Sequence, residues 1–416
     1  MEKQLFIQEP ARDIPVTHQV DLVVAGGGTA GVACAICAAR MGLSVVLIEQ
    51  TVQPGGMVTS VTQWLSDFAD KGGFPLEFLT HLENSGFYRK PYYNGFHLIT
   101  HFDRLLQEAG VIPLYMTKVV APIMEGAKVK GVIVESKQGR HAILARMTVD
   151  ATGDGDVAAR AGAQFEYGRP EDGEIQAISL SMLMGNCKLE AVNLKEELEP
   201  ELRKISPDYS LPYSNGYMRR LPGSESAVLC GLPHVCGYNP LDAESLSKCL
   251  VEMRRQGEEF LELMKRTPIG KGGEGLWFSS LPGVRESRRI LCDTNVTDED
   301  WRDGRMHSDG VITVRHNIDV HKCREGEPPI IVELVKPYQI RYGALLPRGL
   351  DNLLVAGRCI GGTHKALASY RLIADCLAMG EVAAIAASEA IGNDSDLRSI
   401  SVQNLRGELC SRGYNL

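Results

Sequence analysis

One glycine-rich stretch near the N-terminus restricts the fold of this chain more than any other feature. Val20–Ala25 is a short apolar run, which is typical of a buried parallel strand. The pattern GxGxxG follows directly at residues 26–31, and an Ala-rich run that ends at Arg40 predicts a helix. Ser44–Ile48 predicts a second strand. Strand, glycine turn, helix and strand in this order are the fingerprint of a βαβ unit that binds a dinucleotide.

The residue types in this fingerprint each have a physical role. Gly26 permits a tight turn, Gly28 lets the backbone approach a pyrophosphate, and Gly31 allows the helix and the strand to pack closely. The helix N-terminus presents free N–H groups and a partial positive charge to the phosphates. Glu49 lies 23 residues after Gly26, where a carboxylate accepts hydrogen bonds from ribose hydroxyls and disfavours a 2′-phosphate.

Composition limits the partners and the compartment that we expect. A chain of 416 residues is long enough for two or three domains, and its net charge of −8 argues against a nucleic-acid partner. No apolar run reaches membrane-spanning length, and residues 1–16 are polar with two prolines, unlike a secretion signal. The eleven cysteines are odd in number and scattered, which favours a reduced, cytoplasmic interior without a membrane partner.

The N-terminal part continues with helices and a group of strands. After Glu49, the turn Pro54–Met57 contains two glycines that let backbone amides approach a ligand. Amphipathic patterns predict helices over Leu76–Asn84 and Thr100–Ala109. Three further apolar runs predict a three-stranded meander: Leu114–Pro122, Lys128–Glu135 and His141–Val149. The meander leads into a glycine turn at residues 150–156, followed by a short helix, Val157–Ala161.

The middle of the chain, residues 164–339, alternates between glycine turns, charged helices and isolated strands. Asp242–Met264 predicts a long amphipathic helix. Val311–Val320 alternates between apolar and polar residues and predicts one half-buried strand. It places His316 on the face opposite the cluster Asp319, His321 and Cys323, which does not suit tetrahedral zinc, so we expect no metal site. Cys34 and Cys37 lie in the first helix, where we expect core packing rather than redox chemistry.

A second strand–turn–helix unit lies near the C-terminus. Asn352–Ala356 predicts a buried strand, residues 357–364 a glycine turn, and Ala366–Glu389 one long helix. This helix N-terminus is expected at the same sheet edge as the first one, where it would stabilise negative charge.

Four stretches together resemble the two-dinucleotide-binding-domain flavoproteins, whose relatives include glutathione reductase. The resemblance is closer to one branch, bacterial FAD-dependent oxidoreductases distantly related to heterodisulfide reductase. The stretches are PGGM (54–57), DATGDGDVAARAGA (150–163), PGVRESRRI (282–290) and LLPRGLDNLLVAGRCIGGTHKALASYR (345–371). The resemblance implies non-covalent FAD, with its ADP half on the βαβ unit and its ribityl and pyrimidine part on the C-terminal turn.

The residues that the resemblance places at FAD come from five segments: the fingerprint, the PGGM turn, the first meander strand, the 150–156 turn and the C-terminal turn. They are Gly26, Gly28, Thr29, Ala30, Gly31, Glu49, Gln50, Gly55, Gly56, Met57, Val119, Ala151, Gly153, Asp154, Gly357, Arg358, Cys359, Gly361 and Gly362. Val119 is expected to offer backbone atoms to adenine. For Cys359, non-covalent packing is favoured over a reactive thiol or a covalent flavin link.

Two departures from the family pattern matter. Arg358 stands where the superfamily often has Asp, and a guanidinium donates hydrogen bonds but cannot accept one from ribityl. The only other GxGxxG spacing, Gly270–Gly275, follows Arg266–Pro268, which is no strand. A nicotinamide domain is therefore not expected, and neither is the redox disulfide of glutathione reductase.

Three side chains are candidates for catalysis beside the flavin. His364, in the turn before the C-terminal helix, is a candidate general acid or base, with a cap or packing role as the alternative. Arg371 is expected about two turns further along the same helix face. Arg285 belongs to a basic cluster with Arg288 and Arg289, which could clamp an acidic group or form structural ion pairs, for example with Glu286 or Asp375.

These observations predict an α/β fold with a Rossmann-like FAD-binding domain, a parallel sheet plus a three-stranded β-meander, and an inserted α+β substrate domain. The expected boundaries are residues 1–165 and 340–416 for the FAD-binding domain and 166–339 for the substrate or cap domain. The expected function is hydride transfer between flavin N5 and a small polar substrate, with an acidic substrate as one option, and with a separate electron donor or acceptor. An FAD-containing electron-transfer subunit with a protein partner and a flavin monooxygenase stay open as alternatives, as does homo-oligomer formation.

Overall fold

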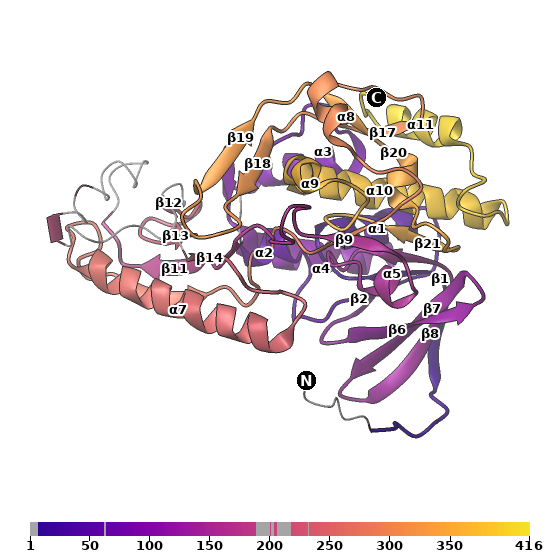
Figure 1. Ribbon diagram of the computed structural model, residues 1–416, viewed down its shortest axis with the longest axis horizontal. Coiled ribbons are helices and arrows are strands. Elements are labelled where there is room, and N and C mark those ends of the chain that lie inside the picture. Colours follow the sequence, from indigo (N-terminus) through magenta and orange to yellow (C-terminus); the bar gives the residue numbers. More distant parts are fainter. Residues whose placement is uncertain (1–6, 62–63, 189–199, 201–203, 206–217, 232) are drawn as a thin grey trace.

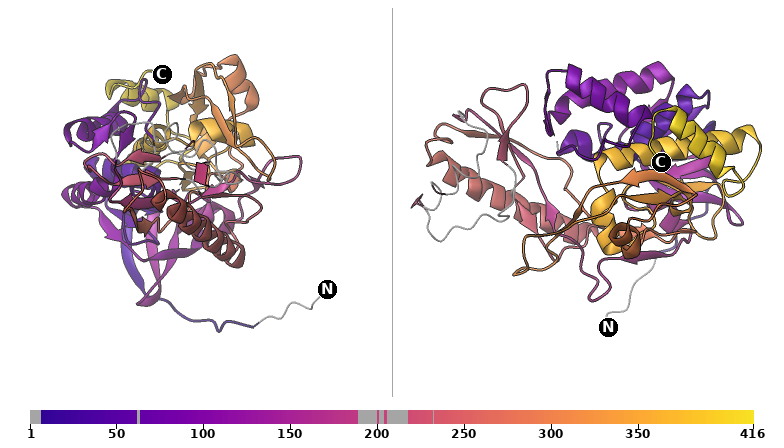
Figure 2. Two further views of the ribbon diagram at one scale, coloured as in Figure 1. Left: turned by 90° about the vertical axis from the view of Figure 1, so that its left-hand side faces the viewer. Right: turned by 90° about the horizontal axis from the view of Figure 1, so that it is seen from above.

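The computed structural model of the chain (Figures 1 and 2) describes residues 7–61, 64–188, 200, 204–205, 218–231 and 233–416. Part of the polar N-terminal segment, residues 1–6, lies outside the described residues. Among the helices that are described, none is long and apolar enough to cross a membrane.

A seven-stranded sheet forms the centre of the molecule, in the order β5-β2-β1-β8-β7-β6, with β21 beside β8. Its strands are β1 (Val16–Ala25), β2 (Val45–Ile48), β5 (Ile112–Leu114), β6 (Lys118–Glu125), β7 (Lys128–Ser136), β8 (Gly139–Asp150) and β21 (Leu353–Val355). β5, β2, β1, β8 and β21 run in parallel, whereas β6, β7 and the first half of β8 form an antiparallel meander. The predicted parallel sheet with a three-stranded meander is confirmed.

The first meander strand, predicted over Leu114–Pro122, is present as β6 but starts later than predicted, because the chain turns within the predicted range. Leu114 ends β5, and β6 begins only at Lys118. Between them Met116 has φ +52°, and its N–H donates to the Thr51 carbonyl at 3.0 Å. This turn carries the chain from the parallel strands into the meander and brings the start of β6 beside the end of β2.

The helices around this sheet come from both ends of the chain (Figure 1). They are α1 (Thr29–Arg40), α2 (Met57–Ser60), α3 (Gly73–Asn84), α4 (Gly95–Ala109), α5 (Asp156–Arg160), α10 (Ile373–Gly392) and α11 (Val402–Ser411), with the hairpin β3 (Tyr88–Arg89) and β4 (Tyr92–Tyr93) between α3 and α4. The C-terminal helix α10 touches α1 at Gly380, where a Cβ would lie 2.1 Å from the Ala30 carbonyl oxygen. Only glycine permits this contact between the two ends of the chain.

The long helix predicted over Ala366–Glu389 is in fact two helices, α9 (His364–Tyr370) and α10. The break lies at Arg371 and Leu372, because Leu372 is extended, with φ −74° and ψ 163°. The break has a consequence for the site: the Arg371 side chain leaves the helix face and donates to two carbonyl oxygens of other segments. The expectation that Arg371 follows His364 on one helix face is therefore wrong.

The single half-buried strand predicted over Val311–Val320 is also wrong. β17 (Gly310–Val314) is buried throughout and pairs with β20 (Tyr338–Arg341), whereas β18 (Ile318–His321) pairs with β19 (Ile330–Glu333). The chain leaves the first ladder at Arg315, whose backbone N–H donates to the Asp67 carboxylate at 3.0 Å. A side chain from a distant segment therefore ends this strand, which local alternation does not reveal.

The remaining strands form small sheets beside the main one. They are β9 (Phe165–Tyr167) with β16 (Arg288–Ile290), β10 (Ile178–Ser179) with β14 (His234–Val235), and the four-stranded sheet of β11 (Met182–Gly185), β12 (Met218–Arg220), β13 (Val228–Cys230) and β15 (Glu274–Phe278). The remaining helices are α7 (Ala243–Lys265), α8 (Asp298–Asp303) and the 3-10 helix η1 (Tyr342–Leu345). The predicted helix at Asp242–Met264 is confirmed as α7, and the Asp242 side chain caps it by accepting from the Ser245 N–H at 2.7 Å. Figure 2 shows α7 to one side of the main sheet.

Three apolar cores hold these parts together. The main core includes the strands of the central sheet, α1 and α10, and continues through residues 290–346. Two smaller cores lie around β11 and α7, within residues 175–264. Cys34 and Cys37 are buried in the main core, as expected for packing residues. The proposed domain limits stay a prediction, and the predicted boundary at residue 339 falls within β20.

Candidate functional site

The fingerprint glycines form a turn that a side chain would destroy. A Cβ on Gly26, which has φ +98°, would lie 2.5 Å from the Ala151 carbonyl oxygen, and one on Gly31 would lie 1.8 Å from the Gly26 carbonyl oxygen. A Cβ on Gly28 would have only the Ala151 oxygen near it, at 4.0 Å. Gly26 and Gly31 thus fix the backbone, while Gly28 borders open space in which a phosphate group can approach.

The N-terminus of α1 is open to an anion. No side chain caps it, no acidic residue lies in its first turn, and the N–H groups of Thr29, Ala30 and Gly31 make no hydrogen bond among the residues that the structure describes. Free N–H groups and the helix dipole at the end of a 12-residue helix suit a pyrophosphate.

Glu49 is held in position at the end of β2. Its carboxylate is 7% exposed and accepts from the Gly27 N–H at 2.8 Å and the Thr51 N–H at 2.7 Å. Carboxylate oxygens have further acceptor sites, so Glu49 can still accept from ribose hydroxyls. Gln50 beside it is exposed, and Val119 is buried in β6, which starts next to Glu49.

The PGGM turn lies directly against the fingerprint. The Gly55 N–H donates to the Gly27 carbonyl at 2.7 Å, and a Cβ on Gly56 would lie 2.9 Å from the Gly28 Cα. Residues 26–31 and 54–57 therefore make one backbone surface, which we call the cofactor cradle, and Met57 begins α2 at its edge.

Two later turns meet beside the cradle and are joined by an ion pair. Arg358 Nη2 donates to Asp154 Oδ1 at 2.6 Å, and Arg358 Nη1 donates to the Ser287 hydroxyl at 2.8 Å. Burial favours a raised pKa for Asp154, but the Arg358 charge and the Ser287 hydrogen bond outweigh it, so the pKa is lowered. Arg358, which departs from the pattern of the resembling superfamily, therefore pairs with a carboxylate of this chain. That carboxylate belongs to Asp154 on the 150–156 turn.

The C-terminal turn packs closely against its neighbours. A Cβ on Gly361 would lie 2.2 Å from Asn295 Oδ1, and one on Gly362 would lie 2.5 Å from the Tyr370 hydroxyl. Gly357 has φ +93°, so this position also favours glycine. Cys359 is fully buried, and burial raises the pKa of its thiol well above the ordinary value, which favours packing over reactivity.

His364 forms a buried dyad with Glu286. Nδ1 of His364 lies 2.8 Å from Glu286 Oε2, and the two side chains are 9% and 0% exposed. Glu286 also accepts from Arg289 and from the Gln176 backbone N–H. Within the described residues no group hydrogen-bonds His364 Nε2. The short helix α9 is capped by Thr363, whose Oγ accepts from the Ala366 N–H at 3.1 Å.

Arg285 and Arg371 lie beside this dyad, in a mostly backbone environment. Arg285 Nη1 donates to the Ala177 carbonyl at 2.8 Å and to the Ser179 hydroxyl at 3.1 Å. Arg371 donates to the Arg285 carbonyl at 3.3 Å and to the Asp319 carbonyl at 2.8 Å, and burial lowers its pKa to about 10. Arg371 therefore remains cationic at neutral pH.

The other two arginines of the basic cluster form structural ion pairs, as the alternative interpretation has it. Arg289 is 1% exposed and pairs with Glu286, while Arg288 Nη1 lies 3.0 Å from Asp156 Oδ1. Sequence reasoning named Glu286 only as an ion-pair partner and missed its role as the partner of His364. Strand geometry predicts Asp319 and His321 on one face, and the structure adds His234 to them.

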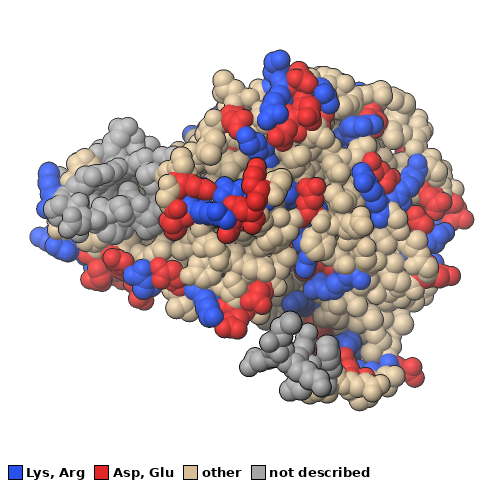
Figure 3. Space-filling view, in the orientation of Figure 1, with Lys and Arg blue, Asp and Glu red and all other residues tan. Residues whose placement is uncertain are grey.

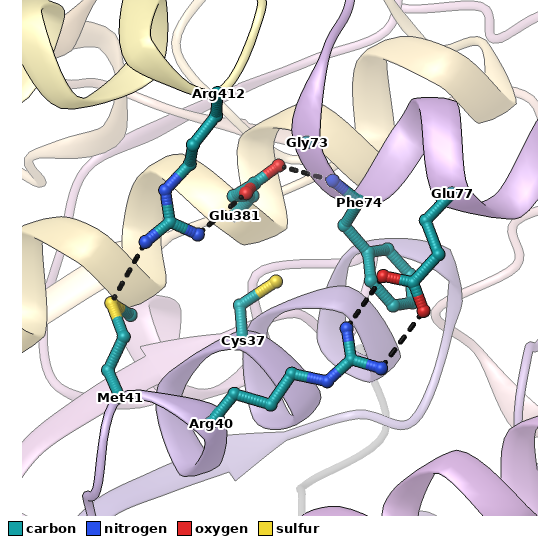
Figure 4. Close-up of a pocket in the computed structure, with 8 residues that line it drawn as sticks. All are labelled: Cys37, Arg40, Met41, Gly73, Phe74, Glu77, Glu381 and Arg412. Atoms are coloured by element: carbon teal, nitrogen blue, oxygen red, sulfur yellow. Dashed lines mark hydrogen bonds and ion pairs between the residues drawn. The ribbon is translucent and has the colours of Figure 1, made fainter.

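A cavity of about 350 Å³ lies at the other end of α1, away from the cradle (Figure 4). It is lined by Cys37, Arg40, Met41, Gly73, Phe74, Glu77, Glu381 and Arg412. Its two guanidiniums are already neutralised, because Arg40 binds Glu77 with two hydrogen bonds and Arg412 binds Glu381 at 3.1 Å. Its charges balance without a ligand, so it is not the candidate site.

Among the described residues and on the face shown in Figure 3, neither potential metal ligands nor charged side chains gather into a second site. The described residues contain no group of three or more His, Cys, Asp or Glu side chains that could hold a metal ion. On the face shown in Figure 3, acidic and basic side chains lie close to one another where charged residues occur.

The fold and the cradle define a dinucleotide-binding α/β protein, and the comparison with known families makes this more specific. The sequence model of the family described as FAD dependent oxidoreductase matches residues 21–409. The chain belongs to this family, it is an FAD-dependent oxidoreductase, and FAD is its cofactor. None of the curated proteins matches the sequence.

Solved structures with a similar arrangement include several flavoenzymes. A geranylgeranyl bacteriochlorophyll reductase-like protein from Thermoplasma acidophilum is 16% identical, with a TM-score of 0.50 over 95% of this chain and 84% of that chain. p-Nitrophenol 4-monooxygenase from Pseudomonas putida is 13% identical, with a TM-score of 0.48 over 95% and 85%. A myxobacterial chondrochloren halogenase is 16% identical, with a TM-score of 0.47 over 94% and 78%. The first of these shows a shared fold.

The described residues fit FAD on three observations. The first is the uncapped N-terminus of α1. The second is the fixed carboxylate of Glu49, and the third is the open space that a Cβ on Gly28 would enter. All three lie at the carboxyl ends of β1 and β2, where a doubly wound sheet binds its ligand.

Proposed function

We propose that this FAD-dependent oxidoreductase transfers hydride between FAD and a small polar substrate that carries an acidic group, with His364 as the proton carrier. When it is bound, FAD supplies the redox chemistry by accepting or giving a hydride at N5. A separate electron donor or acceptor completes the cycle, because the chain has no second strand–GxGxxG–helix unit: Gly270 follows α7 and a turn.

The observation that carries this proposal is the pairing of His364 with Glu286. A buried carboxylate at 2.8 Å from Nδ1 accepts a hydrogen bond from that atom, so the tautomer with its proton on Nδ1 is favoured and Nε2 is left as the acceptor. Nε2 can then take a proton from the substrate, and Glu286 stabilises the imidazolium that results. Glu286 keeps its position because Arg289 and the Gln176 N–H hold its oxygens.

Arg371 is proposed to attract the acidic group of the substrate. Among the described residues its side chain donates to two carbonyl oxygens and to no carboxylate. Three of its five N–H groups remain for a ligand. Arg285, linked to it through its own carbonyl, is proposed to contribute a second positive charge.

We also propose which residues bind FAD and how the chain is divided into domains. The FAD ligands are proposed to be the glycines and side chains of the cradle and of the 150–156 and 357–362 turns, together with Glu49, Gln50 and the Val119 backbone. Residues 1–165 and 340–416 are proposed to bind FAD, and 166–339 to cover the substrate. We further propose that the chain is related to the heterodisulfide reductase branch, that it binds FAD non-covalently and that it is cytoplasmic.

The test is the reduction of the bound FAD by candidate substrates without oxygen. Small hydroxy, keto and amino acids are offered to the purified yellow protein, and loss of flavin absorbance is followed. His364→Ala should retain FAD and slow this step by about 10² to 10⁴, the usual contribution of a general acid or base. Glu286→Gln should give a smaller loss, and Lys365→Ala, on the same helix but paired with Glu333, should have no effect.

Other outcomes discriminate between the alternatives. Unchanged kinetics in His364→Ala would remove this histidine from the mechanism. Reduction by a partner protein but by no small molecule would favour the electron-transfer subunit. Oxygen consumption coupled to hydroxylation of the substrate would favour the monooxygenase.

A further inference from the structure

A carboxylate and a guanidinium lie close together in the His364 region without forming an ion pair. Arg371 Nη2 donates to the backbone carbonyl of Asp319 at 2.8 Å, and Arg371 Nη1 donates to the Arg285 carbonyl at 3.3 Å. Among the residues that the structure describes, no lysine or arginine forms an ion pair with the Asp319 carboxylate. The two opposite charges therefore both keep hydrogen-bonding capacity for a ligand.

The Asp319 carboxylate has no hydrogen-bond donor of its own. Within the described part of the chain no group donates to either of its oxygens, and Oδ1 is buried. Its contact with His321 Nε2, at 3.2 Å, is not a hydrogen bond. The Asp319 side chain is 32% exposed, so a ligand can reach the carboxylate. A partly buried carboxylate without donors favours a ligand that brings N–H groups to it.

The carboxylate is ionised at neutral pH and faces no positive charge that is bonded to it. Burial alone raises the pKa of Asp319, but His321 and the charges of Arg371 and Arg285 outweigh it, so the pKa is lowered. Burial lowers the pKa of His321 to about 3, and the charge of Arg285 acts in the same direction. His321 is therefore neutral at this pH and does not act as a counter-ion.

This carboxylate belongs to the same group of side chains as the proposed proton carrier. Arg371 connects them, because it directly follows α9, which begins at His364, and also binds the Asp319 carbonyl. Its second acceptor is the carbonyl of Arg285, the residue before Glu286, which is the partner of His364. Carboxylate, guanidinium and dyad are thus joined by contacts between neighbouring residues.

The spacing of the two charges indicates what kind of ligand fits both. Arg371 is bonded to the backbone of Asp319, so the guanidinium lies within one residue of the carboxylate. A ligand that uses both groups needs an anion and a cation on adjacent atoms of its own skeleton. An α-amino acid has this arrangement, whereas a 2-hydroxy or 2-keto acid has only the anion and leaves the carboxylate without a counter-charge.

We propose that the substrate of this enzyme is an α-amino acid, with its ammonium group bound by the Asp319 carboxylate and its own carboxylate bound by Arg371. The ammonium donates charge-assisted hydrogen bonds to Asp319, and this contact breaks and forms no covalent bond. The inference rests on the proposed function, because it takes Arg371 as the group that attracts the acidic part of the substrate.

The experiment measures ligand binding to the oxidised full-length holoprotein without oxygen and at neutral pH. The standard amino acids, in both enantiomers, and the small hydroxy and keto acids are titrated while the flavin absorbance is followed, and the half-saturating concentration is recorded. For the amino acid that binds most tightly, the 2-hydroxy acid and the amino acid amide of the same skeleton are then compared with it. Each analogue lacks one of the two charges, so each should bind about 10- to 100-fold more weakly.

A variant of Asp319 tests the assignment of the ammonium group. Asp319→Asn keeps the size of the side chain and removes its charge, so amino acid binding should weaken about 10- to 100-fold. Binding of the matched hydroxy acid should stay unchanged or become tighter, because a negative charge beside its carboxylate is lost. A general loss of structure would weaken both ligands alike. If Asp319→Asn does not fold, the three ligands compared on the wild-type protein decide the question.

The matched control removes a carboxylate from the neighbouring strand. Glu333 lies opposite Ile318 in the pair of β18 and β19, one position from the pair that contains Asp319, and its carboxylate binds Lys365 at 2.6 Å. Glu333→Gln should therefore change the affinity for neither ligand.

The outcomes separate this inference from the proposed function. Equal wild-type affinity for the amino acid and its hydroxy acid, or an equal loss of both in Asp319→Asn, would overturn the inference and leave the role of His364 intact. Amino acid binding that depends on Asp319, together with normal flavin reduction in His364→Ala, would do the reverse. A holoprotein that binds no member of either panel would overturn both.

Discussion

The cofactor cradle and the region around His364 are built in opposite ways. The cradle consists of backbone. Gly26, Gly28 and Gly31 leave space because they have no side chain, and the whole cradle comes from segments within 40 residues of one another. The His364 region consists of side chains from three distant segments, at residues 285–289, 319–321 and 364–371. The first can be damaged by adding one methyl group, the second by removing one charge.

The largest expected effect is a pair of glycine substitutions within the cradle. Gly31→Ala puts a Cβ 1.8 Å from the Gly26 carbonyl oxygen, so α1 must move, and we expect loss of about 3 kcal/mol or more of stability and loss of FAD. Gly28→Ala has no such clash, so the thermal midpoint without FAD should not change while FAD affinity falls. Thermal unfolding and flavin retention measure the two effects. Equal thermal midpoints for the two variants would show that the backbone contact is not what the cradle depends on.

An effect of similar size is expected from the charges of the His364 region. Arg289→Met leaves the buried Glu286 without its main counter-charge and should cost about 3–5 kcal/mol in the free energy of unfolding. The matched control is Arg255→Met on α7, where Arg255 is 60% exposed and pairs with Glu252, and the change should stay within about 0.5 kcal/mol. Denaturant unfolding gives both values. A small effect at Arg289 would mean that the region tolerates loss of charge as the surface does.

A third group of titratable side chains lies outside both regions, between α3 and α4. The rings of His81 and His101 stack with centroids 3.4 Å apart and planes within 4°. His97 lies beside His81, with centroids 5.1 Å apart and the two Nε2 atoms 3.0 Å apart. Burial lowers the pKa of all three, that of His101 to about 3, and the Arg104 charge acts in the same direction. The stack therefore requires neutral imidazoles.

This stack gives the smallest expected effect, a loss of stability in mild acid. The unfolded chain binds protons at its histidines below about pH 6.5, whereas the folded stack does not, so stability falls as pH is lowered from 6.5 toward 3. The limiting slope is about 1.4 kcal/mol per pH unit for each histidine that stays neutral. We expect a fall of about 1 kcal/mol between pH 7 and 5.5 from His101 alone, whose pKa is lowered to about 3. His101→Phe keeps the stack and should reduce this dependence, and an unchanged dependence would contradict the assignment.

The difference between the two regions also explains how far the sequence predicted the structure. The cradle follows from local spacing, because a turn that needs glycine at Gly26 and Gly31 can be recognised from the residues around it. His364 could be placed beside the C-terminal turn for the same reason. Its partner Glu286 lies 78 residues earlier in the chain, and no local pattern connects the two.

The errors in the prediction have the same origin. The strand expected over Val311–Val320 breaks because the Arg315 N–H binds Asp67, 248 residues away in the chain. The helix expected over Ala366–Glu389 breaks at Leu372, next to Arg371, which binds carbonyls of residues 285 and 319. Periodicity reports the local preference of the backbone, and contacts of this range override it.

The position of β21 has a consequence for how the protein is made. Leu353–Val355 pairs with β8, and Arg358 binds Asp154 across 204 residues of intervening chain. A ribosome must therefore have translated the chain as far as Val355 before the central sheet is complete. Until then the nascent polypeptide holds the nucleotide-recognition turn without its closing strand, so cofactor loading into the complete fold follows the synthesis of β21.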